Sequence, residues 1–244
     1  MTTPLLPVFR ACAAELPAAF RAEHERLFAE EHLAALAERL EEFRRKGVPA
    51  GPPPPYLAAE CTAHLEEAFA FFHPALVAWE AAGNEETPEV VRAFAAALAA
   101  AGCANLLLLL GQRRTPASVT DARAIPPLRE VLLASADRPH TPGVALTVAA
   151  RALAKHAHRS PGAFWGTPSG PAERQNEHAR QVLGQILGEK TWWNVFGHYQ
   201  HELVYEARVR SGHGARWGHS GEEFIGFLEP FEEPEELTFD DESP

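Results

Sequence analysis

Leu203-Val-Tyr-Glu-Ala-Arg-Val-Arg210, followed by Ser211-Gly-His-Gly214 and Ala215-Arg-Trp-Gly-His219, is the stretch that decides the fold class. Its first part alternates apolar and polar residues with a period of two, which is typical of a β-strand. The glycine-containing part predicts a turn and the third part a second short strand. Ser220-Gly221 and residues 223–228 predict another turn and strand, and residues 192–199 are a candidate fourth strand. The sequence therefore predicts a small antiparallel sheet.

Helical patterns surround this sheet on its N-terminal side. Thr141-Pro142 resembles a helix start, with Thr as N-cap and Pro in the first turn, and predicts a helix to about His158. A second helix is expected over residues 171–187, ending at Gly188. Residues 141–231 are thus predicted to form a helix–helix–antiparallel-sheet module.

The first 140 residues predict a separate all-α domain. Residues 5–46 are rich in Ala, Leu, Glu and Arg and favour a helix that breaks near Pro17. The proline-rich run at residues 47–55 ends it, and a second helix is expected over 56–81. A third helix starts at Thr87-Pro88, runs to about Gly111 and is apolar nearly all round, which predicts burial. With a short helix at 128–134, the whole chain is expected to be α+β.

Composition limits the class of protein. The chain has 244 residues, 46% of them hydrophobic, which is enough for a substantial core. The apolar run around Leu106–Leu110 is too short to span a bilayer, and no secretory signal is evident. Cys12, Cys61 and Cys103 are widely spaced and predict reduced thiols. We therefore expect a cytoplasmic protein without a membrane partner.

The net charge of −11 is unevenly distributed. Residues 232–244 form an acidic tail with seven acids and no base, whereas residues 141–231 carry nine Lys and Arg against eight Asp and Glu. The module is near neutral, so charge alone does not predict nucleic-acid binding. One hypothesis is that the tail mimics RNA and shields the module, in which case deleting it raises activity or RNA affinity.

Lys155 and His156 are the first candidate catalytic pair. They lie near the end of the helix that starts at Thr141, and Arg159 follows as a candidate substrate-binding residue. A histidine can take a proton from a ribose hydroxyl, and a lysine can neutralise the charge that develops on phosphorus. The alternative is that these cations only stabilise a helix C-terminus through the helix dipole.

The turn and strands supply the other candidates. His213 lies between two glycines and Arg216 follows on the next strand, so both are candidate catalytic residues. Trp217 is a candidate for base stacking and Arg208 for phosphate binding, with a solvated strand face as the favoured alternative for Arg208. Trp165, Trp192 and Trp193 are expected to pack in the core.

The sequence gives little support for a metal site or a bound cofactor. His198, His201 and Glu202 resemble half of a metal site, but no second ligand pair accompanies them. Phosphate-binding glycine loops, dinucleotide fingerprints and serine nucleophile motifs are also absent from the sequence. We therefore predict neither a metal nor a cofactor.

Two resemblances arise from these residues. Lys155-His156-Ala157, Phe164-Trp165-Gly166, Val204–Trp217 and Phe224–Pro230 are similar to an uncharacterised family of bacterial and fungal proteins. The order helix–helix–sheet, with Lys-His ending a helix, resembles metal-independent ribonuclease toxins of the barnase, RelE and tRNA-cleaving colicin type. The colicin resemblance implies catalytic roles for Lys155 and His156 alone. A basic residue expected just before Lys155 is missing, because Leu153-Ala154 occupy those positions.

Three hypotheses follow. The first is a metal-independent endoribonuclease that uses the ribose 2′-hydroxyl to attack the adjacent phosphate, with RNA as partner. His156 and His213 are then the acid–base pair, and Lys155, Arg208 and Arg216 stabilise the phosphorane. The second is a non-enzymatic protein that binds a protein partner or itself through the N-terminal helices. The third is a metal hydrolase that uses His198, His201 and Glu202.

Overall fold

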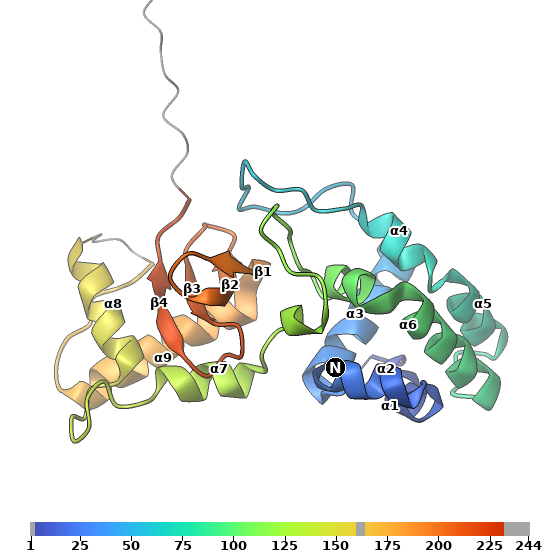
Figure 1. The fold of residues 1–244 in the computed structure, drawn as a ribbon, viewed down its shortest axis with the longest axis horizontal. Helices are drawn as coiled ribbons and strands as arrows, with labels where there is room; N and C mark the ends of the chain where they lie inside the picture. The colour runs from blue at the N-terminus through green and yellow to red at the C-terminus, as the bar shows by residue number, and fades with distance from the viewer. Residues whose placement is uncertain (1–2, 160–163, 232–244) are drawn as a thin grey trace, which may run out of the picture.

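The computed structural model describes residues 3–159 and 164–231, and its helices and strands separate along the chain (Figure 1). The first half holds α1 (Leu6–Glu15), α2 (Ala18–Glu23), η1 (Glu25–Phe28), α3 (Glu30–Lys46), α4 (Leu65–Ala70), α5 (His73–Ala81) and α6 (Pro88–Leu109). The second half holds η2 (Ala122–Ala124), α7 (Arg129–Ala136), α8 (Val148–Arg159), α9 (Ala172–Glu189), β1 (Lys190–His198), β2 (Glu202–Val209), β3 (Gly214–Gly218) and β4 (Phe224–Leu228). The α+β prediction is confirmed.

Helix α6 is the centre of the helical half. It starts as the sequence predicts, because the Thr87 side chain accepts a hydrogen bond from the amide of Val90 at 3.3 Å. It contacts α1, α3, α4 and α5, and much of it is buried. Length and composition alone would allow α6 to cross a membrane, contrary to the sequence prediction, but half of its apolar window is buried within the protein. A central core helix of a soluble protein has the same properties.

The sheet follows the order β1-β2-β3-β4, and every neighbouring pair is antiparallel. The predicted strand over residues 192–199 exists as β1, and the predicted turns connect the other strands. Helix α9 contacts β1, β2 and β3, while α8 contacts α9 and β4. The two helices therefore cover the sheet and bring the end of α8 beside the last strand.

The outer edge of β1 is paired with the segment that follows α6. The amide of Arg113 donates to the carbonyl oxygen of Trp193 and that of Val119 to Val195, both at 2.9 Å, while Gly197 donates to Ala117 at 3.1 Å. These contacts join the helical half to the sheet. They also give hydrogen-bond partners to an edge strand that would otherwise be open.

The predicted helix over residues 56–81 is wrong in its first part. Residues 51–64 form no helix, and α4 begins only at Leu65. The amide of Cys61 donates to the carbonyl of Arg114, and the Thr62 hydroxyl accepts from the amide of Arg114, both at 2.8 Å. Glu60 also forms a buried ion pair with Arg113. These tertiary contacts replace the local hydrogen bonds of a helix.

The predicted helix start at Thr141-Pro142 is also wrong. Helix α8 begins at Val148, and Thr147 accepts a hydrogen bond from the amide of Ala150 at 3.2 Å. Asn176 holds the preceding loop by accepting from the amide of Thr147 and donating to the carbonyl of Ala145. A second threonine, closer to the amphipathic run, therefore starts the helix.

Packing does not change sharply at residue 140. Helix α7, which the sequence assigns to the helical domain, contacts α9 and β4. The Trp217 indole donates to the carbonyl oxygen of Leu132 at 3.1 Å, and the buried hydrophobic residues of both halves form one continuous cluster. The division of the chain at residues 140 and 141 stays a prediction.

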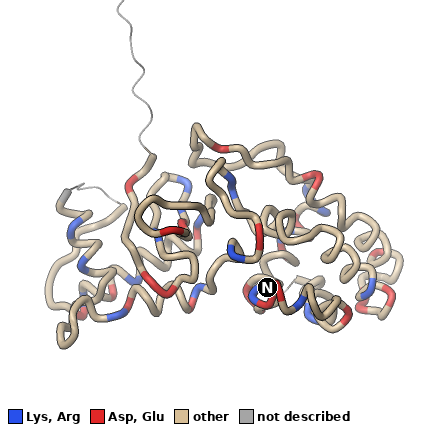
Figure 2. The backbone as a smooth tube through the Cα atoms, in the orientation of Figure 1, with Lys and Arg blue, Asp and Glu red and all other residues tan. Residues whose placement is uncertain are grey.

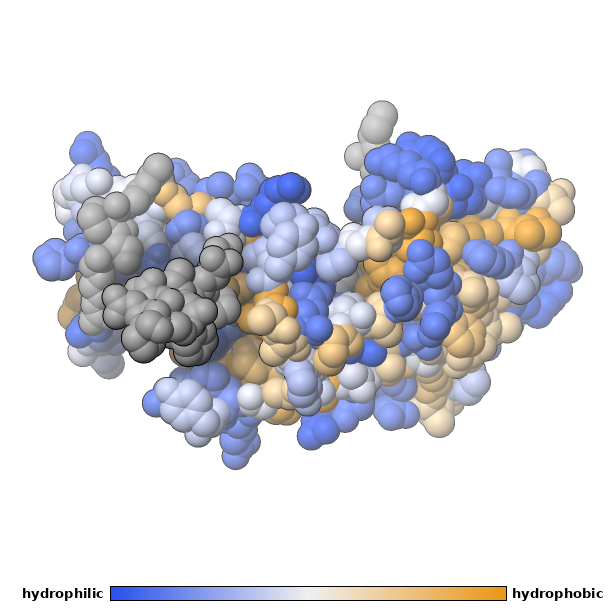
Figure 3. All heavy atoms as spheres, turned by 90° about the horizontal axis from the view of Figure 1, so that it is seen from above, coloured by the Kyte–Doolittle hydropathy of each residue, from blue (hydrophilic) through white to orange (hydrophobic). Residues whose placement is uncertain are grey.

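Apolar residues gather on the surface of the helical half, at the right of Figure 3. Phe71 and Val77, from the α4–α5 region, are among the exposed large hydrophobic residues. A protein partner or self-association through these helices stays a prediction.

Candidate active site

An open pocket of about 380 Å³ lies between α8 and β4. Its polar lining comes from His140, Arg151, Lys155, His156 and Arg216, and its apolar walls from Val148, Ala152, Ile225, Phe227 and Leu228. None of the described residues in this lining is acidic. The structure thus brings together three of the four predicted catalytic residues, namely Lys155, His156 and Arg216.

The helical repeat of α8 places its polar residues on two different faces. Arg151 and Lys155 are four residues apart and share one face, because an α-helix turns once in about 3.6 residues. Neither side chain has a hydrogen-bond or ion-pair partner among the described residues. His156 is turned from them toward the sheet, with its ring 6.2 Å from Phe227 and 5.4 Å from Trp165 between centroids. One helix therefore presents solvated cations and a packed histidine to the same pocket.

Several side chains beside the pocket contact Glu229, which lies directly after β4. The His156 Nδ1 lies 2.9 Å from Glu229 Oε1, and the Trp165 indole donates to both carboxylate oxygens at 3.1 Å. His213 Nε2 approaches Oε2 at 3.9 Å. Trp165 is only 1% exposed, so the carboxylate is anchored by a rigid buried donor. Side chains from α8, a loop and the β2–β3 turn converge on this one carboxylate.

His213 approaches the second oxygen of Glu229 and is not among the residues that line the pocket. Its ring stacks on Phe164 at 4.3 Å between centroids, and its Nδ1 is 2.9 Å from the Ser211 hydroxyl. Burial lowers the pKa of His213, the Arg208 charge lowers it further, and the Glu229 carboxylate partly offsets both. The structure places His213 next to His156 through their shared carboxylate, but not in the lining of the pocket.

Arg216 reaches the pocket from β3 and is held by a buried carboxylate. Its guanidinium donates to Glu206 Oε2 through Nε at 2.9 Å and Nη2 at 2.6 Å. Arg208 takes the other oxygen of Glu206, and Arg216 Nη1 lies 3.0 Å from His198 Nε2. Because Glu206 is 1% exposed, this carboxylate fixes both arginines by charge-assisted hydrogen bonds.

Two predicted substrate-binding roles disagree with the structure. Arg208 is buried, donates to the carbonyl oxygens of Gly212 and Glu229 at 2.6 Å, and lies over the Phe231 ring. Its hydrogen-bonding groups therefore serve the fold and not a phosphate. Trp217 is 0% exposed, so it offers no face for base stacking. Arg159 ends α8, and its side chain lies outside the described residues.

His198 and His201, at the end of β1 and in the β1–β2 turn, do not line the pocket. His198 and His201 lie 5.3 Å apart between ring centroids, and burial and the Arg216 charge lower the pKa of His198. Across residues 3–159 and 164–231, no group of three or more His, Cys, Asp or Glu side chains is arranged to hold a metal ion.

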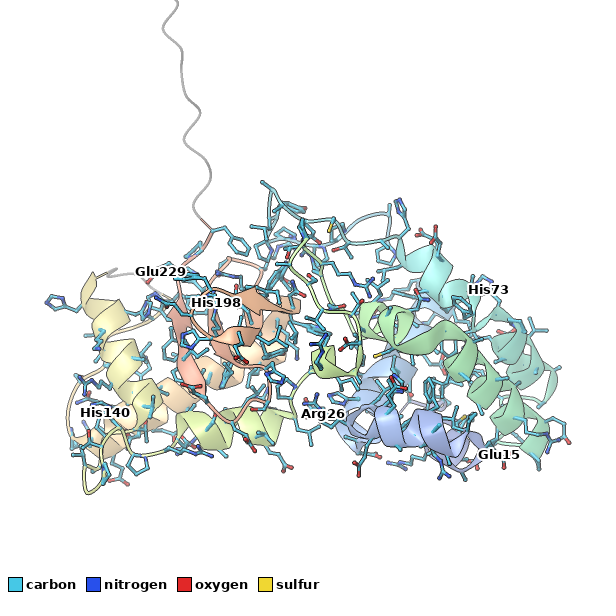
Figure 4. All side chains as sticks on the ribbon, viewed as in Figure 1. Glu15, Arg26, His73, His140, His198 and Glu229 are labelled. Atoms are coloured by element: carbon cyan, nitrogen blue, oxygen red, sulfur yellow. The ribbon has the colours of Figure 1, made fainter. Side chains whose placement is uncertain are left out.

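Glu229, His140 and Arg151 are site residues for which the sequence alone predicts no role. Glu229 has a weak signal, an acid between the last predicted strand and Pro230. Arg151 stands four residues before Lys155, a spacing that predicts a shared helix face. His140 is brought to the pocket by a loop, and the sequence holds no signal for that approach. Figure 4 shows His140 and Glu229 toward opposite ends of α8.

No curated protein and no solved structure matches the chain. A family model does match residues 134–229, and its description is CdiA C-terminal tRNase toxin domain. This range contains the whole pocket and the side chains that meet at Glu229. The C-terminal part of the chain, and with it the candidate site, therefore resembles a ribonuclease toxin domain.

Proposed function

We propose that this chain is an endoribonuclease whose C-terminal module cleaves RNA without a metal ion. The convergence of Lys155, His156 and Arg216 on one pocket carries the proposal. The match of the same residues to a tRNase toxin domain supports it and makes tRNA the first substrate to test.

His156 is the proposed general base. A neutral imidazole that donates its Nδ1 proton to the Glu229 carboxylate keeps a lone pair on Nε2. That lone pair takes the proton of the ribose 2′-hydroxyl as the 2′-oxygen attacks the adjacent phosphorus. A carboxylate that fixes the tautomer and orientation of a histidine is a recurrent device in acid–base catalysis.

Lys155 and Arg216 are the proposed phosphate ligands. Both line the pocket beside His156, and both are cations able to donate several hydrogen bonds. They would stabilise the charge on the non-bridging oxygens of the phosphorane. Lys155 would also give a proton to the leaving 5′-oxygen. The products are then a 2′,3′-cyclic phosphate and a 5′-hydroxyl end.

His213 is the proposed positioning residue. It faces the second oxygen of Glu229 and stacks on Phe164, outside the pocket lining. Its role would be to hold the carboxylate that holds His156. This assignment replaces the direct acid–base role that the sequence suggests for His213.

The test is cleavage of a tRNA pool by the purified full chain in EDTA. A Lys155→Ala/His156→Ala variant removes a phosphate ligand and the base, and should lose activity by at least about 100-fold. A Lys46→Ala/His158→Ala variant is the matched control, because both residues are exposed and outside the pocket. It should cleave like the wild type and leave 2′,3′-cyclic ends.

Absence of cleavage by the wild type would overturn the proposed function. Cleavage that returns only when a divalent metal is added would overturn the metal-independent mechanism. Equal loss in both double variants would show that the pocket is not the site.

A further inference from the structure

The pocket continues past the proposed catalytic residues toward the start of α8. Arg151 and His140 line this end and have no role in the proposed reaction. Because Arg151 and Lys155 are four residues apart, their side chains leave the helix about 6 Å from each other. Neighbouring phosphates along a nucleic-acid strand have a comparable separation.

We propose that Arg151, assisted by His140, binds the RNA phosphate adjacent to the one that is cleaved. The inference rests on the proposed function, since it extends the same pocket by one phosphate. Arg151 would act as a binding residue, while Lys155 and His156 act on the scissile phosphate. The site would therefore hold at least two consecutive phosphates along α8.

None of the described residues neutralises the charge on this helix face. Arg151 and Lys155 have no ion-pair partner in the described part of the chain, and acidic residues are missing from the pocket lining. Figure 2 shows Lys and Arg positions in blue along α8. Unpaired cations above apolar walls form a region of positive potential that attracts an anion.

His140 lines the same pocket as these two cations. Burial lowers its pKa, and the nearby charges of Arg151 and Lys155 lower it further. The three groups are thus close enough to interact, although they come from a loop and a helix. An imidazole in this position can donate a hydrogen bond to a phosphate oxygen without adding a full charge.

A second pocket provides a contrast within the same module. It is lined by Ala145, Glu173, Arg174, Asn176, Glu177 and Arg180 along α9. There Arg180 is paired with Asp137 at 3.1 Å and with Glu177 at 2.8 Å. Arg180 is thus neutralised by two acidic side chains, whereas the Arg151 guanidinium can bind a ligand.

The test measures binding of a short fluorescent 2′-O-methyl oligoribonucleotide, which lacks the attacking hydroxyl, to the full chain at increasing salt. Each phosphate contact in a single strand contributes about 0.7 to the slope of log affinity against log salt. Arg151→Ala should reduce that slope by about 0.7 and weaken binding roughly three- to tenfold at low salt. Arg151→Lys should retain most of the slope, because it keeps the charge.

Arg210→Ala is the matched control, since Arg210 is an exposed arginine of the same module outside the pocket. It should leave the slope at the wild-type value. Equal slopes for Arg151→Ala and the wild type, or equal losses in both variants, would overturn the phosphate site.

Cleavage of tRNA is measured in parallel, so that the two proposals can fail separately. A protein that cleaves tRNA but shows no dependence of binding on Arg151 loses the second phosphate site alone. A protein with the Arg151-dependent slope but no cleavage keeps the phosphate site and loses the proposed function.

Discussion

The Glu229 carboxylate receives contacts from His156, Trp165 and His213, which come from different segments of the chain. A carboxylate accepts on both oxygens, so it can hold several donors at once. His156 Nδ1 lies at Oε1 and His213 Nε2 is nearer to Oε2, while the Trp165 indole donates to both oxygens. The orientation of the proposed base thus depends on a residue that does not line the pocket.

Glu229→Gln should lower the rate of RNA cleavage by about 10- to 100-fold while the protein stays folded. The carboxamide keeps one acceptor oxygen but carries no negative charge, so it stabilises less well the imidazolium that forms when His156 accepts the 2′-hydroxyl proton. Single-turnover rates across a pH series measure the loss, and nitrogen NMR of the histidine reports its tautomer. A rate within twofold of the wild type would contradict the role of Glu229.

At the scale of elements, the β3–β4 turn is held against the loop before α7. Gly221 adopts a φ of +82°, and a Cβ added there would lie 2.5 Å from Pro127 Cβ and 3.2 Å from Leu132 Cδ2. Glycine is required for two reasons, since the backbone is left-handed and its neighbour approaches closely. The turn therefore fixes α7 to the sheet at one backbone contact.

Gly221→Ala should destabilise the protein by about 2–4 kcal/mol through backbone strain and overpacking. The free energy of unfolding from urea titration measures this effect. Gly51→Ala is the control, because a Cβ at Gly51 meets no atom within 4 Å and its φ is not positive. Similar unfolding midpoints for the two variants would show that the β3–β4 turn does not anchor α7.

The elements themselves were largely predictable from local pattern. Strong period-two alternation gave β2, and the glycine turns gave the limits of β3 and β4. Residues 56–64 were misassigned because Arg113 and Arg114, which are distant in sequence, supply their hydrogen-bond partners. The start of α8 was misplaced because the sequence prediction rests on a cap at Thr141 alone, whereas the helix starts directly after Thr147, whose amide donates to Asn176.

The site was predictable only where its residues lie close together in sequence. Lys155 and His156 were found as a pair, and the structure places both at the pocket. Period-two alternation does not reveal which strand face is covered, so the sequence suggests base stacking for Trp217 although α7 and the sheet bury it. The role of Glu229 depends on three tertiary contacts, which cannot be inferred from a single sequence.

At the scale of the whole molecule, buried histidines couple stability to pH. His32 in α3 is 4% exposed, and its Nδ1 lies 2.8 Å from the carbonyl oxygen of Arg26. Burial lowers the pKa of His32 from its ordinary value of 6.5. Below pH 6.5 the unfolded chain therefore binds a proton that the folded chain resists. The stability that His32 contributes is complete above pH 6.5 and is lost as the pH falls through its folded pKa.

His32→Gln should reduce the loss of unfolding free energy between pH 7.5 and pH 5.5, because one depressed histidine has been removed. Urea titration of the wild type and the variant at both pH values measures the difference. His64→Gln is the control, since His64 is exposed. Identical pH dependence in the wild type and His32→Gln would show that His32 does not contribute to acid sensitivity.

The pairing of residues 112–119 with β1 has a consequence for any attempt to excise the module. A fragment that began at residue 134, where the family match starts, would lack the chain that donates to Trp193 and Val195. Its first strand would then present a row of vacant backbone groups, which invites edge-to-edge aggregation or strand exchange between copies. Solubility of the isolated C-terminal module should therefore require a fragment that starts before Gln112.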